Sequence, residues 1–411
     1  MMNKAIFIND ILASARKSLS AAENPDDKQA MEIIVRAVFD DPRCSVLDDE
    51  EAEECINKIF FKTRCRLGIL QPLADDENVT EIMVNGPENI FVEKGGKIEK
   101  YRFCFASAEE LEEVIRNVAG DVHREISEMN PIVDARLADG SRVNGVYKNV
   151  AVNGPILTIR KFSERYMKMA DLINNGTVTE DAAFLLEILV ECGYNIFVSG
   201  GTSSGKTTLL NTLADSVPRQ ERVIVIEDSA ELKLPGIENI VHMECRSSNA
   251  SGKGQVSMSQ LIRSSLRMRP DRIIVGEVRG AEVADMLQAM NTGHSGSMST
   301  GHGNSVTGML RRLESMYLMA QSLDIDAVRA QIAEGIDIIV HIEKFGDGRR
   351  RIVEITEIAG YENGRFELNP LMTAGGNGSL VYTGNKLINS RKIILKGEKY
   401  GEKLRKSGIV G

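Results

Sequence analysis

Residues 200–207 constrain the fold of this chain more than any other segment. They read Gly-Gly-Thr-Ser-Ser-Gly-Lys-Thr and match the pattern G-x-x-x-x-G-K-[ST] in full. An apolar segment at 195–199 precedes them, and a helix-forming segment at 208–213 follows. A Gly/Ser surface turn could match the pattern by chance, but the flanking strand and helix favour a loop that binds phosphate.

The chemistry of such a loop needs these residue types. Glycines let the backbone curl so that successive N–H groups point inward, which creates a cradle of partial positive charge. We expect Lys206 to reach the β- and γ-phosphate oxygens of a nucleoside triphosphate and Thr207 to ligate Mg²⁺. The predicted nucleotide-binding residues here are Gly200, Gly201, Thr202, Ser203, Ser204, Gly205, Lys206, Thr207 and Thr208.

The chain has 411 residues, which favours two or three domains. We expect a helical segment at 1–65, an α+β domain at 66–160, a linker at 161–176, the domain with the phosphate loop at 177–367 and a C-terminal extension at 368–411. Apolar strands near 195–199, 223–227 and 272–276 are separated by helical segments. This alternation predicts an α/β fold with a largely parallel sheet covered on both faces.

Composition excludes several classes of protein. A formal charge of −9 argues against a dedicated nucleic-acid binder. The six cysteines form no C-x-x-C pair, and no apolar run approaches the roughly 20 residues that cross a bilayer. The N-terminus also lacks a signal-peptide pattern. We therefore expect a cytoplasmic protein without a transmembrane segment.

Two segments after the loop carry carboxylates at strand ends. Residues 266–277 end in an apolar strand closed by Gly276 and Glu277, which predicts that Glu277 emerges at the carboxyl edge of the sheet. Taken alone, Glu277 could be an ordinary surface glutamate, but hydrolysis beside a phosphate loop needs a carboxylate that activates water. Another apolar strand ends in Glu227, Asp228 and Glu231.

Two histidines lie in the hydroxyl-rich stretch 291–305. His294 and His302 are eight residues apart with no cysteine nearby, a spacing that does not fit a zinc site. The small polar residues between them predict a strand that lines a site. We interpret the histidines as candidates for sensing the γ-phosphate.

These motifs, in this order, resemble those of the secretion-ATPase superfamily, which drives type II and type IV secretion and type IV pilus assembly. The resemblance covers about residues 65–360 and includes IEDSAEL, VGEVRG, NTGHSGSMSTGHGNS, ENVTEIMVN and ARLADGSRVNGV. The residues in these motifs are most similar to those of the CpaF-type tight-adherence pilus assembly ATPases. The resemblance implies a RecA-like domain preceded by a small PAS-like α+β domain.

The resemblance also implies roles for individual residues. Glu277 would be the catalytic base. Glu231 would lie near the attacking water, and His302 would be the first candidate for a residue at the phosphates, with His294 as the second. Asp228 and Glu227 would lie near Mg²⁺ together with Thr207. In that family, arginines of the N-terminal domain close over the bound nucleotide. The matching stretches of this chain contain Arg136, Arg142 and Arg160.

Two departures from related sequences stand out. Gly276 replaces the aspartate that commonly precedes the catalytic glutamate, and the tetracysteine zinc module of some relatives is absent. The resemblance implies a hexamer that uses ATP and Mg²⁺ at an inner-membrane platform to assemble a pilus. The alternatives are a conjugative type IV secretion ATPase and a scaffold that binds ATP without turnover.

Overall fold

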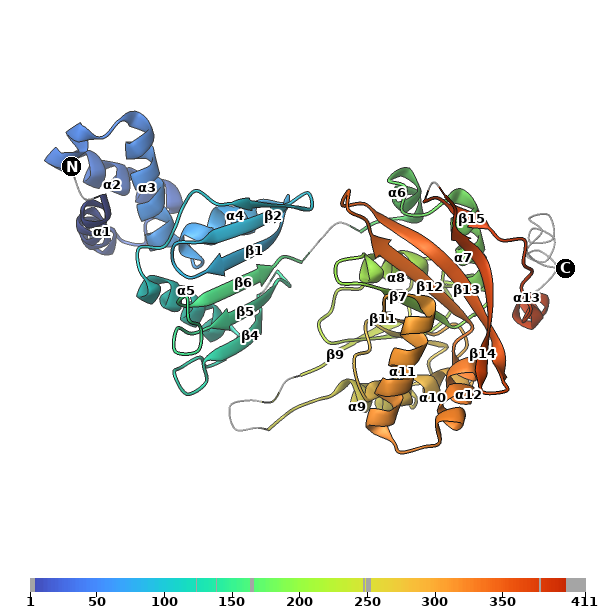
Figure 1. Ribbon diagram of the computed structural model, residues 1–411. Helices are drawn as coiled ribbons and strands as arrows, with labels where there is room; N and C mark the ends of the chain where they lie inside the picture. Colours follow the sequence, from blue (N-terminus) through green and yellow to red (C-terminus); the bar gives the residue numbers. More distant parts are fainter. Residues whose placement is uncertain are drawn as a thin grey trace. The chain divides into compact units, whose positions relative to one another are not determined.

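The structure is a computed structural model that describes residues 4–122, 124–137, 139–162, 166–246, 248, 253–376 and 378–396. The chain divides into two compact units, Met1–Glu164 and Arg165–Gly411 (Figure 1). Each unit has its own buried apolar cores. None of the helices within the described ranges is long and apolar enough to cross a membrane.

The first unit begins with three helices, α1 (Lys4–Ala21), α2 (Asp27–Phe39) and α3 (Asp49–Arg64). Capping boxes at Asp26 and Asp48 start α2 and α3, so the acidic run at 48–54 is the start of a helix. The helices bury one shared cluster of side chains that includes Phe7, Ile34 and Ile59. A short helix at Pro42–Val46 joins α2 to α3.

A six-stranded antiparallel sheet follows in the same unit. Its order is β3-β2-β1-β6-β5-β4, built from β1 (Val79–Asn85), β2 (Ile90–Lys94), β3 (Lys97–Lys100), β4 (Ile132–Arg136), β5 (Arg142–Val146) and β6 (Ile156–Arg160). Short helices at Gly68–Leu70 and α4 (Gln71–Asp75) precede the sheet, and α5 (Ala108–Asp121) packs on it. A Cβ on Gly145 would lie 2.7 Å from Ile115 of α5, so glycine permits this close packing.

The second unit contains a nine-stranded sheet with the order β15-β14-β13-β12-β7-β11-β10-β8-β9 (Figure 1). The strands from β12 to β9 are parallel: β7 (Ile196–Gly200), β8 (Val223–Glu227), β9 (Ile240–Glu244), β10 (Arg272–Val275), β11 (Met298–His302) and β12 (Ile338–Lys344). The remaining strands add antiparallel pairs: β13 (Arg350–Glu362), β14 (Arg365–Ala374) and β15 (Leu380–Tyr382).

Helices cover both faces of this sheet, which confirms the predicted α/β arrangement. One face packs against α6 (Met169–Asn174), α7 (Glu180–Glu191) and α8 (Lys206–Ala214). The other packs against α9 (Met258–Ser265), α10 (Glu282–Asn291), α11 (Val306–Ala320) and α12 (Ile325–Gly335). On β7, Ile196 and Val198 point into the first core and Phe197 into the second, which is the alternation of a central strand.

The sheet continues beyond residue 367, where the sequence predicted an extension to begin. Strand β14 crosses that position, and β15 and α13 (Arg391–Lys396) follow it. The carboxylate of Glu357 is completely buried and accepts hydrogen bonds from the backbone N–H groups of Ile388 and Asn389. The segment after β15 is thereby fixed to the sheet.

Candidate nucleotide-binding site

The phosphate loop lies at the carboxyl end of β7, between β11 and β12 in the parallel part of the sheet. A Cβ on Gly200 would lie 2.3 Å from the carbonyl oxygen of Ile342, so only glycine fits there. Ser203 and Gly205 have left-handed backbone conformations, with φ of 57° and 94°, and α8 begins at Lys206. The loop therefore curls over the N-terminus of α8, where backbone N–H groups bind anions.

Lys206 links this loop to β11. Its side chain is buried, and Nζ lies 2.8 Å from the carbonyl oxygen of Gly201 and 3.3 Å from Nδ1 of His302. Because a lysine ammonium has only donors, Nδ1 must accept, and the ring proton of neutral His302 therefore lies on Nε2. Burial lowers the pKa of His302, and the charge of Lys206 lowers it further, which favours the neutral ring.

Glu277 lies between His302 and an arginine. Its Oε1 lies 2.7 Å from Nε2 of His302. Its Oε2 accepts hydrogen bonds from Nε and Nη2 of Arg279, at 3.1 and 2.6 Å. The structure thus brings together three predicted site residues, Lys206, His302 and Glu277. It adds Arg279, a residue of the VGEVRG motif that was not among the predicted site residues.

A buried carboxylate explains why Gly276 stands where an aspartate is common. Glu227 is 3% exposed, and its carboxylate accepts hydrogen bonds from the backbone N–H groups of Glu231 and Leu232. A Cβ on Gly276 would lie 3.0 Å from Cγ of Glu227, so Glu227 fills the space beside β10. The role of Glu227 near Mg²⁺ stays a prediction; in this structure its carboxylate is turned into the protein and bonded to the backbone.

The remaining oxygen ligands near the loop suit a magnesium ion held together with phosphates. Thr207 is partly exposed on the first turn of α8, and Asp228 is exposed at the end of β8. Glu231 lies close enough to act electrostatically on Arg279. Among the described residues, no group of three His, Cys, Asp or Glu side chains could hold a metal ion by itself. Mg²⁺ commonly takes only one or two protein carboxylates and completes its shell with phosphate oxygens and water.

The structure does not bring His294, the second predicted histidine, into this cluster. His294 precedes β11, whereas His302 is the last residue of that strand, so the two lie at opposite edges of the sheet. Nδ1 of His294 lies 3.0 Å from the carbonyl oxygen of Ala289 in α10. Its contacts are with the end of a helix, away from the phosphate loop.

The three predicted arginines of the first unit are neighbours in its sheet. Arg136 pairs with Arg142 across β4 and β5, and Arg142 pairs with Arg160 across β5 and β6. Directly paired residues on adjacent strands point to the same face, where like charges repel. A row of three cations is a suitable surface for an anion.

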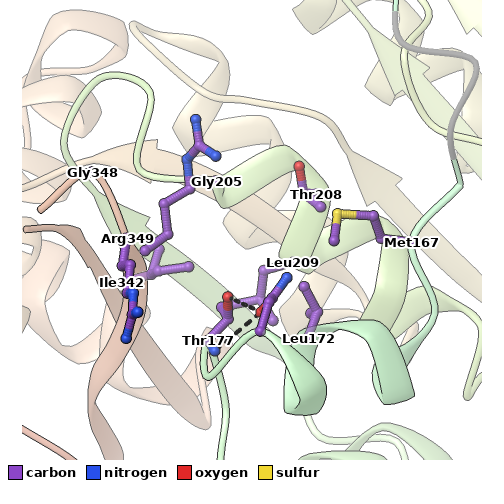
Figure 2. A pocket seen from close by; sticks show the side chains of 11 residues that line it. Met167, Leu172, Thr177, Gly205, Thr208, Leu209, Ile342, Gly348 and Arg349 are labelled. Carbon is purple, nitrogen blue, oxygen red and sulfur yellow. Dashed lines mark hydrogen bonds between the residues drawn. The ribbon is translucent and has the colours of Figure 1, made fainter. Parts of the chain in front are cut away.

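Two hollows adjoin the phosphate loop. One is a cavity of about 190 Å³. It is lined by Gly205, Thr208 and Leu209 together with the segments around Thr177 and Arg349 (Figure 2). Oδ1 of Asn175 accepts hydrogen bonds from both the N–H and the hydroxyl of Thr177 in its wall.

A more open hollow contains Gly201, Thr202 and His302 and extends to Arg311 and Arg312 on α11. Both arginines are exposed. Neither arginine was among the predicted site residues, because a helix with two adjacent arginines has no distinctive pattern.

A doubly covered parallel sheet, whose central strand runs into this loop and a helix N-terminus, is the architecture of a P-loop nucleotide-binding protein. The family follows from a direct comparison. Residues 65–358 match the model of the type II/IV secretion system protein family, and the chain belongs to that family.

Two relatives agree with this membership, and a solved structure shares the fold. A putative conjugal transfer protein of Mycobacterium tuberculosis is 35% identical over 294 residues, which cover 70% of this chain and 83% of that protein. The conjugal transfer protein TrbB of Rhizobium radiobacter is 35% identical over 299 residues, 71% of this chain and 88% of that one. The pilus retraction motor PilT, solved with ADP, superposes with a TM-score of 0.51 at 18% identity over 84% of this chain and 89% of that chain, a likeness of fold.

Proposed function

We propose that this protein is an ATPase that powers a pilus-assembly or type IV secretion machine, with Glu277 as its catalytic base. The observation that carries the proposal is the contact of His302 with both Lys206 and Glu277. A residue that binds phosphate and a carboxylate that can accept a proton are thereby joined at the carboxyl edge of one parallel sheet. Hydrolysis of a phosphoanhydride needs both groups.

In the proposed reaction, water attacks the γ-phosphorus of ATP. A new P–O bond forms, the bond to the β,γ-bridging oxygen breaks, and Glu277 accepts the proton of the attacking water. Lys206 exchanges the carbonyl of Gly201 and the ring of His302 for phosphate oxygens, and the N–H groups of the loop bind the β-phosphate. Thr207 and Asp228 would hold Mg²⁺, which supplies charge neutralisation between the phosphates when it is bound.

The nucleoside part of ATP needs space next to the phosphate loop. The cavity beside Gly205 and Thr208 supplies it on the side of α8, with a wall of mixed polar and apolar residues. We propose that the row formed by Arg136, Arg142 and Arg160 neutralises charge that develops on the phosphates, in the same copy or a neighbouring one.

The proposed assembly is a cytoplasmic hexamer docked on proteins at the inner face of the membrane. Its work would be domain movement coupled to binding and release of the γ-phosphate. We propose tight-adherence pilus assembly as the system, because the residues of the motifs are most similar to those of the CpaF-type ATPases. The conjugal transfer relatives favour a second candidate equally, a conjugative type IV secretion system.

Two experiments test the proposal. Purified protein should release phosphate from ATP, whereas an ATP-binding scaffold would bind the nucleotide without releasing phosphate. The protein should also be recovered from membranes of its own cells together with its partners. Pilus platform proteins would support the first system, and DNA-processing proteins would replace it with the second.

A further inference from the structure

We propose that Arg279 is a positioning residue that orients the carboxylate of Glu277 for proton transfer. The inference rests on the proposed function, in which Glu277 is the base. It adds a residue to the reaction that acts through Glu277 and does not itself touch the nucleotide.

The backbone that carries both side chains is held at three points. The N–H of Gly276 donates to the carbonyl of Ile226 in β8, and the N–H of Val278 donates to the carbonyl of Thr300 in β11, at 2.9 and 3.0 Å. The N–H of Arg279 donates to Oε1 of Glu282 at 2.6 Å. Bonds to two neighbouring strands and to the first residue of α10 therefore fix the turn after β10.

From this fixed turn, the guanidinium of Arg279 folds back onto Glu277, two residues earlier. Both Nε and Nη2 donate to the same oxygen, Oε2. The contact raises the pKa of Arg279, so the guanidinium stays charged. Nη1 lies 3.9 Å from Oδ2 of Asp228, too far for a hydrogen bond.

The two oxygens of the carboxylate have different neighbours. Arg279 contacts Oε2, and His302 lies 2.7 Å from Oε1. A carboxylate has about four lone-pair sites, so two contacts leave capacity to accept a hydrogen bond from water. Without the hydrogen bonds from Arg279, the carboxylate could rotate about its last bond, and proton transfer depends steeply on such geometry.

The proposal is tested with the variants Arg279→Ala and Arg279→Lys. For each variant, steady-state phosphate release and equilibrium nucleotide binding are measured. Arg279→Ala should lower kcat on the order of 10- to 100-fold, as expected when a reacting group is displaced by about 1 Å. KM and the affinities for ATP and ADP should stay within about twofold, because binding residues are untouched. Arg279→Lys should restore part of kcat, since an ammonium can hold Oε2 through a single bond.

A matched control is Arg263→Ala. Arg263 is also exposed and pairs with a carboxylate in the same unit, with Nε 3.1 Å from Oδ1 of Asp285, but it lies outside the site. This variant should hydrolyse ATP as the wild type does. In a Glu277→Gln background, Arg279→Ala should cause no further loss of rate, because the residue acts through Glu277.

Three results would overturn the inference. The first is a kcat of Arg279→Ala at or above that of the wild type, and the second is an additive loss in the Glu277→Gln background. The third is a selective loss of ATP affinity relative to ADP, which would mean that Arg279 contacts the γ-phosphate. If the wild type and Arg263→Ala both fail to release phosphate, the proposed function itself has failed; if both are active and Arg279→Ala matches them, this inference alone has failed.

Discussion

Nε2 of His302 lies 2.7 Å from Oε1 of Glu277, while Nδ1 of the same ring lies 3.3 Å from Nζ of Lys206. One imidazole therefore spans the phosphate loop and the proposed base. Because the two nitrogens face a donor and an acceptor, the arrangement needs a neutral ring with its proton on Nε2. Binding of phosphate by Lys206 would release one side of this ring.

The protonation state of His302 can be measured directly. Its pKa should lie below the ordinary imidazole value of about 6.5, because burial and Lys206 oppose the charged form. The contacts of the neutral ring with Lys206 and Glu277 should therefore persist at pH values above the lowered pKa of His302. They should be lost as the pH falls through this pKa, and ATPase activity should fall over the same range. Titration of the ring protons by NMR checks this, with His302→Gln identifying the signal. A midpoint above 6.5 would mean that Glu277 dominates the environment of the ring.

Replacement of Lys206 should weaken nucleotide binding. In Lys206→Ala the charged donor to phosphate is gone, and a hydrogen bond to a charged group contributes about 1.5–3 kcal/mol, or roughly 10- to 100-fold in affinity. Fluorescent ATP binding measures the effect. Lys97→Ala, on the exposed strand β3, removes the same charge outside the phosphate loop and should bind normally. Equal affinities for the two variants would contradict the proposed role of Lys206.

Gly276→Ala tests the packing of Glu227 beside β10. The added Cβ would lie 3.0 Å from Cγ of Glu227, whose carboxylate is buried and bonded. Overpacking of this kind should lower the free energy of unfolding by about 1–3 kcal/mol, visible as a lower melting temperature. Gly346→Ala is the control, because its Cβ would meet nothing within 4 Å. Wild-type stability of Gly276→Ala would refute this account of the glycine.

Thiol labelling tests the cores of both units. Cys104 is exposed, whereas Cys55 in α3 and Cys192 at the end of α7 are buried. Burial raises the pKa of both buried thiols to about 11, so little reactive thiolate forms at neutral pH. A maleimide should therefore modify Cys104 well before the other two, as followed by peptide mass spectrometry. Equally fast labelling of Cys192 would be inconsistent with the packing of α7.

Local patterns made the centre of the second unit predictable. The phosphate loop is one continuous segment, and β7, β8 and β10 are apolar runs because both of their faces are buried. Strands at or next to the edges of the sheet lack this signal. Strand β9 is only partly buried, and β14 contains Pro370 and alternates weakly, so neither strand was predicted.

Site residues were predictable only where their position at the end of a strand places them at the carboxyl edge of the sheet. Glu277 and His302 both follow or end strands at the carboxyl edge, and the structure brings them together. The structure does not bring His294 to them, because the separation of eight residues spans the whole of β11 and puts His294 at the other edge. The burial of Glu227 under Gly276 and the return of Arg279 onto Glu277 depend on packing between strands and on a turn, which no sequence motif encodes.

Phosphate release by Glu277→Gln tests the central claim most directly. Glutamine keeps the size of the side chain but cannot accept the proton of the attacking water, so the variant should bind ATP like the wild type and hydrolyse it on the order of 100-fold or more slowly. Wild-type turnover by Glu277→Gln would contradict the assignment of Glu277 as the base.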